Sequence, residues 1–423
     1  MARIMHAKPP AIVAIVVAIS LLALIACAVP PASPTAVPIK PAAAVPAVEK
    51  PAPAAATADM KPDPALLAKM FPANYNFDPL VTEAMAHASV QPSDADKQLA
   101  LKCWKNQGCE TGRGTLTVAY AQGSPINYWT NMVMMEFVLQ ALSYPDVKKI
   151  VITVASSDPQ KEISDLRSLA AQKVDVIVAG VTQGEADLPP IREATQAGVA
   201  VVPILSEIGG TPGKDYASEA LFDWAGVGRD QAQVVVKELN GSGSVAIFGG
   251  PPGYKPMVDV TKAAEEVLAK APGITYLGEQ DTMITEESAF KVASSFLSRF
   301  PKIDAIIHPG SADMRGAVRA YQTVNRPIDG LWMLLTDSQG IISDWEKANN
   351  PKWKMYMTPQ MTHVARIALT LGLAAKAGKP VPTKWVAPIN IFPITKGIYD
   401  PSQPDDYGAT INIPKDVIQA MFK

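Results

Sequence analysis

Cys103 and Cys109 lie six positions apart in a polar stretch, a spacing that indicates either a disulfide or a metal site. Outside the cytoplasm, two cysteines this close are expected to form a disulfide that closes a small loop. A metal site would need further ligands, and the chain has just 4 histidines, which are widely separated. We therefore predict a disulfide and no metal site.

A second chemical motif, Gly-Gly-Thr-Pro-Gly-Lys at 209–214, is similar to a phosphate-binding loop. It has one residue too few between its glycines, and Asp215 stands where a Mg²⁺-binding hydroxyl is required. An irregular surface loop is the expected structure. The G-x-S-x-G and H-E-x-x-H patterns do not occur, and no G-x-G-x-x-G follows a strand. No carboxylate pair is recognisable as a glycosidase site. We predict that the protein is not an enzyme and has no cofactor.

The composition is that of a soluble globular protein long enough for two domains. The chain has 423 residues, of which 48% are hydrophobic and 18% charged, and its formal net charge is −2. Chains of this length commonly divide into two domains with separate cores. Charge is not segregated along the sequence, so there is no long-range attraction to phosphate backbones. Nucleic acid is therefore not an expected partner.

The first 27 residues have the pattern of an export signal. A basic start precedes an apolar run from Ala11 to Ala26, which is too short for a comfortable transmembrane helix. The run ends in Leu-Ile-Ala-Cys at 24–27, which resembles the lipobox of bacterial lipoproteins. The resemblance implies that Cys27 is acylated and anchors an extracytoplasmic protein to the bacterial cell membrane. A secretory signal with an accidental cysteine is the alternative.

Two segments separate this signal from the main fold. Residues 28–64 are rich in Ala, Pro and Val, and their prolines predict a disordered linker of extended character. At about 3.1 Å per residue such a linker would reach roughly 100 Å. Residues 65–113 predict a helical adaptor, with short helices at 65–71, 79–88 and 94–106.

From residue 115 onward, strand-like and helical segments alternate. Strands are expected at 116–119, 150–154, 176–179, 199–205, 245–248, 274–277, 305–307 and 331–335. Helices are expected between them at 126–143, 160–173, 187–197, 229–239, 257–269, 286–299 and 312–323. Continuous β-branched runs separated by helices predict parallel sheets covered on both faces. The fold class is therefore α/β, with two doubly wound parallel-sheet lobes.

The residues after these strands are too few for a third lobe. They predict a strand near 354–358, a long apolar helix at 361–376, a strand near 384–391 and a polar tail. These elements are expected to complete the two lobes by crossing back between them.

The order of landmarks from Gly114 to Lys423 resembles the type I periplasmic binding proteins of ABC sugar importers, specifically the ribose-binding-like group. The landmarks are the turn Ala-Gln-Gly-Ser-Pro-Ile-Asn-Tyr-Trp at 121–129, Asp-Pro-Gln-Lys-Glu-Ile-Ser-Asp-Leu at 158–166, Lys-Val-Asp-Val-Ile-Val at 173–178 with Gly-Val-Thr-Gln-Gly-Glu at 180–185, Ala-Gly-Val-Ala-Val-Val-Pro at 197–203, Lys-Ile-Asp-Ala-Ile-Ile at 302–307 with Gly-Ala-Val-Arg-Ala at 316–320, and Thr-Asp at 336–337. No single landmark is specific, but their order and spacing are.

The resemblance implies three hinge crossings between the lobes, near 223–228, 357–361 and 382–388. It assigns 114–225 with 359–385 to the N-terminal lobe and 226–358 with 386–423 to the C-terminal lobe. It also implies that a ligand lies between the lobes, at the carboxyl ends of the strands. Open parallel sheets bind ligands at the same edge on general grounds.

Family positions carried over to this chain predict ligand contacts after the first strand, at Ser124, Asn127, Tyr128 and Trp129. Aromatic rings there can lie on the C–H face of a sugar, while Asn and Ser bond to its hydroxyls. The alternative for Tyr128 and Trp129 is a place in the lobe's core. Asp337 matches a family aspartate that accepts bonds from sugar hydroxyls, and charge-assisted bonds of this kind are strong. Its alternative role is to cap a helix at 338–347.

Further candidate contacts come from the other loops at strand ends. For each of them a solvated loop residue is the alternative, and Asp313 could instead cap its helix. These candidates are Gln183, Glu207, Tyr254, Lys255, Asp313 and Gln360.

The chain departs from the ribose-type pattern at three places. Leu-Ser-Glu at 205–207 replaces an Asp-Arg pair, the loop at 249–255 lacks an arginine, and Gly310-Ser311 replaces an asparagine. The solute class therefore does not transfer, although Lys255 could still meet an anion.

The resemblance implies a monomeric binding protein that captures a small polar solute, a sugar or polyol, by hinge closure. It would deliver that solute to an ABC permease with its ATPase. A ligand-sensing lipoprotein of the same fold, signalling to a membrane receptor or kinase, is the alternative function. A repressor of the same fold would need a cytoplasmic helix-turn-helix, and here the lipobox takes its place.

Overall fold

The structure, a computed structural model, describes residues 60–422. The predicted signal peptide, its Cys27 and most of the predicted linker lie outside the described residues. Within the described part, no helix combines the length and the apolar character needed to cross a membrane.

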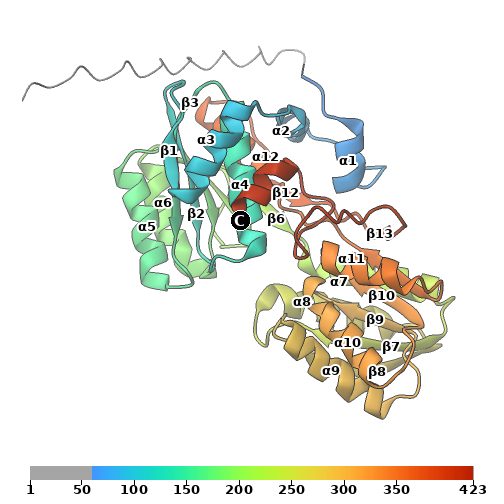
Figure 1. The fold of residues 1–423 in the computed structure, drawn as a ribbon. Helices are drawn as coiled ribbons and strands as arrows, with labels where there is room; N and C mark the ends of the chain where they lie inside the picture. Colours follow the sequence, from blue (N-terminus) through green and yellow to red (C-terminus); the bar gives the residue numbers. More distant parts are fainter. Residues whose placement is uncertain (1–59, 423) are drawn as a thin grey trace, which may run out of the picture. The chain divides into compact units, whose positions relative to one another are not determined.

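The first lobe is built on a seven-stranded sheet in the order β1-β3-β2-β4-β5-β6-β12 (Figure 1). Neighbouring strands are parallel, except that β1 pairs antiparallel to β3. The strands are β1 (Gly108–Glu110), β2 (Leu116–Gln122), β3 (Val147–Val154), β4 (Val176–Gly180), β5 (Ala200–Leu205), β6 (Glu219–Phe222) and β12 (Lys384–Ala387).

Helices cover both faces of this sheet, which requires apolar residues at successive positions of its inner strands. In β2, Val118 and Tyr120 belong to one core, whereas Ala119 and Ala121 belong to the core on the opposite face. Successive side chains of a strand point to opposite faces, so a strand that is buried on both faces needs apolar side chains at most of its positions. The first core lies under α4 (Tyr128–Ser143) and α12 (Val364–Lys376), and the second under α5 (Pro159–Ala171) and α6 (Leu188–Gln196).

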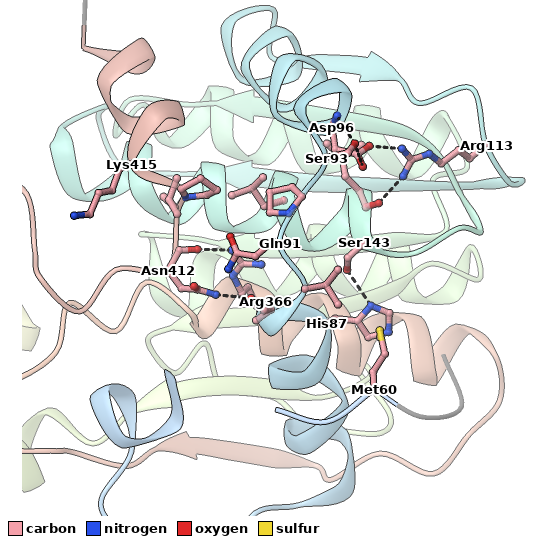
Figure 2. Close-up of a pocket in the computed structure, with 17 residues that line it drawn as sticks. Met60, His87, Gln91, Ser93, Asp96, Arg113, Ser143, Arg366, Asn412 and Lys415 are labelled. Carbon is pink, nitrogen blue, oxygen red and sulfur yellow. Dashed lines mark hydrogen bonds and ion pairs between the residues drawn. The ribbon is translucent and has the colours of Figure 1, made fainter. Parts of the chain in front are cut away.

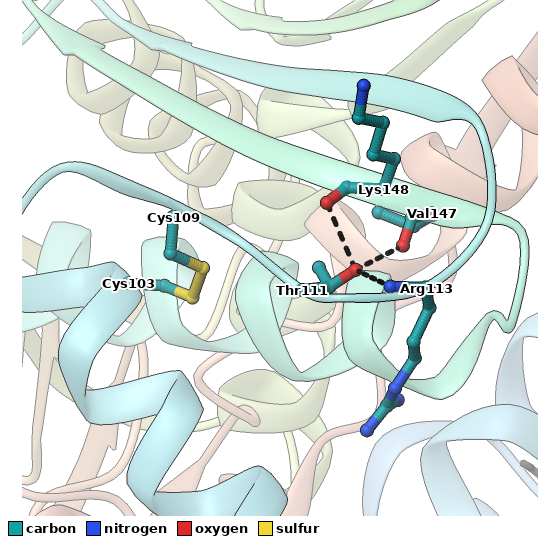
Figure 3. Close-up of a disulfide and its surroundings, with 6 residues drawn as sticks. All are labelled: Cys103, Cys109, Thr111, Arg113, Val147 and Lys148. Carbon is teal, nitrogen blue, oxygen red and sulfur yellow. Dashed lines mark hydrogen bonds between the residues drawn. A yellow bond between two sulfur atoms is a disulfide. The ribbon is translucent and has the colours of Figure 1, made fainter. Parts of the chain in front are cut away.

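The predicted adaptor is part of the first lobe. Its helices are α1 (Pro64–Met70), α2 (Pro79–Ser89) and α3 (Asp94–Lys105). Phe71, Val81 and Met85 are buried in the same core as α4 and α12. Cys103 at the end of α3 is bonded to Cys109 in β1, with a Cα–Cα distance of 4.8 Å (Figure 3). The disulfide thus joins a helix of the adaptor to the edge strand of the main sheet.

The second lobe is built on a six-stranded sheet in the order β13-β11-β10-β9-β7-β8. All pairs are parallel except β11 with β13. One core lies under α7 (Trp224–Glu238) and α8 (Lys255–Leu268), and the other under α9 (Glu286–Arg299), α10 (Arg315–Thr323) and α11 (Gln339–Ala348). The strands are β7 (Gly243–Gly249), β8 (Ile274–Asp281), β9 (Ala305–His308), β10 (Gly330–Leu334), β11 (Trp353–Met357) and β13 (Phe392–Pro393).

Three segments connect the two sheets. They lie at residue 223, between β6 and α7, at 358–363, between β11 and α12, and at 388–391, between β12 and β13. The first two overlap the expected crossings. The third begins later than expected, because Lys384–Ala387 pair with β6 and so stay in the first sheet.

The C-terminal residues also differ from the expected division, which assigned 386–423 to the second lobe. β13 joins the second sheet, but α13 (Lys415–Met421) packs on α3. Val417, Ile418 and Met421 are buried in the core of the first lobe. Burying these apolar side chains in the first core, with α13 on α3, brings the chain end back to the lobe from which the fold starts.

The predicted α/β fold of two doubly wound lobes is confirmed, and most predicted segments coincide with observed elements to within a few residues. Three strands were not predicted: β1, β6 and β13. Each has four residues or fewer. A run this short shows no periodicity that could distinguish it from a loop.

Candidate functional site

The predicted ligand residues lie on loops at the carboxyl ends of parallel strands. In the first lobe these residues follow β2, β4 and β5, and in the second they follow β7, β9, β10 and, for Gln360, β11. Backbone N–H and C=O groups at strand ends are free of the sheet's ladder, so this edge is where such sheets hold ligands.

Glu207 and Lys255 line one pocket of about 390 Å³ at the hinge, together with Trp224 and Lys384. Both predicted residues are already paired: Glu207 Oε1 lies 2.6 Å from Lys384 Nζ, and Lys255 Nζ lies 2.5 Å from Asp259 Oδ2. The hydrogen bond to Glu207 is the main cause that raises the pKa of Lys384. The charged side chains Glu207 and Lys255 of this pocket are therefore each paired with a residue of opposite charge.

Asp337 lies at the end of β10 and is fully buried. Its Oδ1 accepts a hydrogen bond of 2.7 Å from the Thr410 hydroxyl, and its Oδ2 accepts one of 3.1 Å from the Thr410 backbone N–H. Burial raises the pKa of Asp337 to about 6, against the opposing effect of these bonds. The N-cap residue of α11 is Ser338, so Asp337 does not fill the alternative role of a helix cap.

The partners of Asp337 belong to residues 405–413, which we call the C-terminal strap. Gly408 in the strap packs so closely that an added Cβ would lie 2.4 Å from Gln360 Cγ and 2.9 Å from Asp337 Oδ1. The strap is also tied to the first lobe, where Asn412 N–H donates to Glu136 Oε1 at 3.1 Å. The C-terminal strap thus covers Asp337 with protein.

Gln360 lies in the second crossing and is buried beside Asp337. Its side-chain Nε2 donates to the backbone carbonyl of Asp337, and its backbone N–H donates to the Thr410 hydroxyl. The Trp129 indole donates to the Gln360 carbonyl at 2.9 Å. The Gln360 Oε1 atom has no hydrogen-bond partner among the described residues. The hydrogen bond from Trp129 therefore holds the second crossing in place, while the side-chain oxygen of Gln360 has no partner among the described residues.

Tyr128, at the start of α4, lies beside the same cluster. Burial is the main cause that raises the pKa of its phenol, and the charges of Asp313, Asp406 and Asp337 add to the effect. Tyr128 thus lies close enough to these carboxylates of the second lobe for their charges to affect its pKa. The neighbouring Ser311 and Thr336 hydroxyls are 3.0 Å apart.

Asp313 lies in the turn after β9 and forms a buried pair with His308. Its Oδ2 is 2.9 Å from His308 Nε2, and His308 Nδ1 is 2.7 Å from the carbonyl oxygen of Phe248. Burial disfavours the charged imidazole, but the charge of Asp313 and the hydrogen bonds outweigh it and raise the pKa of His308. Asp313 Oδ1 is buried and has no partner among the described residues.

Gln183 lies on the loop after β4, above a second buried pair. Its N–H donates to Asp187 Oδ2 at 2.8 Å, and the Glu162 carboxylate accepts bonds of 2.7 and 2.8 Å from the N–H and hydroxyl of Thr182. Burial, followed by the charge of Glu162, raises the pKa of Asp187 to about 7. The carboxyl groups of Glu162 and Asp187 therefore hold this loop in place through hydrogen bonds to Thr182 and Gln183.

The remaining predicted residues are not drawn into these groups. Asn127 caps α4, accepting from the Thr130 N–H at 2.9 Å in a capping box. Ser124 accepts a bond from the Gln122 side chain. Tyr254 precedes α8 with 51% of its surface exposed.

Sequence reasoning missed Thr410, His308 and Glu162. Nothing near Thr410 in the sequence marks it, because its partner lies 73 positions away. His308 ends a strand five residues before Asp313, a spacing that could have suggested the pair. Glu162 lies within a predicted helix, where a buried carboxylate is the less frequent outcome.

A further cavity of about 570 Å³ lies on the first lobe and contains none of the predicted ligand residues (Figure 2). His87 and Arg366 line it with residues of the α2–α3 loop and the start of α13. His87 Nδ1 is 3.0 Å from the Ser143 hydroxyl, and burial lowers the His87 pKa to about 4. In the described part of the chain, no cluster of three or more His, Cys, Asp or Glu residues is arranged to hold a metal.

Comparison with known proteins identifies a family model described as periplasmic binding protein domain, which matches residues 118–380. A xylitol-binding protein of Mycolicibacterium smegmatis is 26% identical over 187 residues, which is 43% of this chain and 53% of that protein. The chain thus spans about half the length of this relative.

Two solved structures illustrate the similarity of fold. A periplasmic ribose ABC transporter protein from Conexibacter woesei has a TM-score of 0.57 and 21% identity, covering 66% of this chain and 92% of that one. A fructose-binding periplasmic domain of a hybrid two-component system has a TM-score of 0.54 and 20% identity, covering 67% and 91%. At this identity the likeness concerns the fold.

Proposed function

Because the chain belongs to the periplasmic binding protein domain family, we propose that it is an extracytoplasmic binding protein that captures a sugar or polyol between its lobes. The observation that carries the proposal is the cluster at the strand ends of the second sheet. There Tyr128 lies near the charges of Asp313 and Asp337, and two buried acceptors, Asp313 Oδ1 and Gln360 Oε1, have no partner among the described residues. A ligand rich in hydroxyl donors satisfies such acceptors, and an aromatic ring suits its C–H face.

The mechanism is hinge closure and involves no chemical step. A solute that contacts both lobes stabilises the closed state by the difference in its affinity for the closed and open states. The contacts from the first lobe would come from Tyr128 and from the Gln183 loop, and those from the second lobe from the loops after β7, β9 and β10. The names of the xylitol- and ribose-binding relatives support a small neutral solute.

Delivery to an ABC permease with its ATPase is the role that we favour for the closed form. Acylation at Cys27 would keep a monomer near that permease, since lipid chains acting together anchor a protein stably. The fructose-binding domain of a two-component system supports a second role, signalling to a membrane kinase. A purified permease complex whose ATP hydrolysis is stimulated by the liganded protein would favour delivery.

The capture proposal is tested by a thermal-shift screen of monosaccharides, disaccharides and polyols against the mature protein. At least one compound is expected to raise the melting temperature in a dose-dependent manner, because a ligand at 100 times its Kd adds about 2.7 kcal/mol of stability. Amino acids and nucleosides serve as matched negative sets. Stabilisation by an amino acid and by no sugar or polyol would replace the solute class, and no response to any set would remove the capture function.

A further inference from the structure

We infer that Asp313, held by His308, is the residue that selects the solute, that Asp337 is a structural anchor, and that the site takes neutral polyhydroxy compounds rather than sugar acids. This inference rests on the proposed function and names its acceptor and its substrate class.

Asp337 is enclosed by protein, with the C-terminal strap bonded to its carboxylate. Both of its oxygens accept bonds from Thr410, and its side chain is fully buried. The close approach of Gly408 to Asp337 and Gln360 leaves no room for a solute between them. A hydroxyl could reach Asp337 only by displacing the C-terminal strap, which would break its bonds to both lobes.

Asp313 has one oxygen bonded to His308 and one buried oxygen without a partner among the described residues. The Phe248 carbonyl can only accept, so His308 Nδ1 carries a proton, and an imidazole that also donates from Nε2 to Asp313 is an imidazolium. Such a partner fixes the orientation of the carboxylate and leaves Oδ1 as an acceptor without a partner among the described residues. An unsatisfied buried carboxylate oxygen is costly, and a hydroxyl donor relieves that cost.

The absence of a side chain at Gly310 allows the backbone to pack closely against this pair. A Cβ there would lie 2.9 Å from Asp313 Oδ1 and 2.8 Å from His308 Nε2. A side chain at residue 310 would therefore displace Asp313 or His308 and disturb this acceptor.

The charges of this site favour donors over anions. Asp313 Oδ1 and Gln360 Oε1, which have no partner among the described residues, are both acceptors. The cations of the hinge pocket are engaged, Lys255 with Asp259 and Lys384 with Glu207. A ligand carboxylate would therefore face acceptors without a free cation, and that arrangement repels it.

The test measures Kd by calorimetry for two matched pairs of probes, xylitol with xylonate and ribose with ribonate. For the mature wild-type protein, at least one neutral probe is expected to bind 100-fold or more tightly than its acid. Asp313→Asn is expected to weaken that neutral probe by 10- to 100-fold and to narrow the preference over the acid. Asp344→Asn, which removes a carboxylate paired with Arg315 elsewhere in the lobe, is the charge-matched control and is expected to keep the wild-type Kd.

Asp337→Asn separates the two aspartates. It is expected to lower the midpoint of thermal unfolding, through weaker anchoring of the strap, with a smaller change in Kd than Asp313→Asn. Wild-type affinity in Asp313→Asn, or preferential binding of an acid, would overturn the inference while the capture function stands. If the wild-type protein bound none of the four probes and no other sugar or polyol, the proposed function would fail, and the inference with it.

Discussion

Each lobe buries a pair of ionisable side chains under its strand ends, and the two pairs are electrostatic opposites. In the first lobe Glu162 and Asp187 are both acids, and their proximity helps to raise the pKa of Asp187 to about 7. In the second lobe His308 and Asp313 attract each other, and the pKa of His308 is raised. Equivalent places in two similar lobes therefore hold like charges in one and opposite charges in the other.

The comparison teaches that opposite electrostatics can give the same direction of pH dependence. Asp187 favours its neutral form in the fold, so its contribution is lost as pH rises from its unfolded pKa of about 3.9 towards 7. His308 favours its charged form, so its contribution is present below about 6.5 and is lost as pH rises through the higher folded pKa. The first lobe loses stability by gaining a repelled charge, and the second by losing an attracted one.

The largest expected effect comes from removing the positive member of the second pair. His308→Leu leaves Asp313 buried without its partner and is expected to cost about 3–5 kcal/mol in the free energy of unfolding. Urea denaturation at pH 6 measures it. The double change His308→Leu with Asp313→Leu is the control, because replacing both members by apolar groups removes the buried charge and is expected to recover most of the loss. If the double variant were as unstable as the single one, packing rather than charge would hold this site.

A smaller effect of opposite sign is expected in the first lobe. Asp187→Asn keeps an oxygen that can accept from the Gln183 N–H and removes the titrating group. Its stabilisation over wild type is expected to be larger at pH 8 than at pH 5 by about 2–3 kcal/mol. The slope due to His308 is common to both proteins and cancels in the difference. A gain independent of pH would show that Asp187 does not titrate in this range.

The smallest effect is expected for an ion pair at the surface, which serves as a reference for the two buried pairs. Lys161 and Asp165 form an exposed pair on α5, one turn apart, with 2.7 Å between Nζ and Oδ2. Lys161→Gln is expected to change the free energy of unfolding by about 0.3 kcal/mol, a change that shrinks further in salt. A loss comparable to that of His308→Leu would mean that burial is not what distinguishes the inner pairs.

A feature of this protein can be predicted from the sequence when the residues that determine it lie close together along the chain. The two lobes follow from local alternation of apolar strands and amphipathic helices, because the pattern within one segment decides what that segment forms. The short strand β6 escaped prediction, and so did the return of α13 to the first lobe, since both depend on pairing with distant segments. The predicted disulfide pair, by contrast, lies within a single helix-to-strand turn.

The candidate site divides in the same way. Glu207 and Lys255 were predicted as ligand residues from their loops, yet each already has a charged partner. Asn127 was predicted to meet a ligand, and its side chain caps α4, a role that its place before a helix also allows. Loop position indicates that a residue lies at the edge of the sheet, but not which neighbour takes its hydrogen bonds.

The amino-acid sequence by itself determined the two parallel-sheet lobes and the edge at which their loops meet, because both follow from patterns within short stretches of chain. Only the tertiary structure decided which partners the two aspartates of the second lobe bond to. Asp337 is closed by a threonine 73 positions away, and Asp313 is oriented by a histidine whose other nitrogen binds a carbonyl 60 positions away. Hydrogen bonds over such separations depend on how the whole chain packs, and no local pattern encodes them.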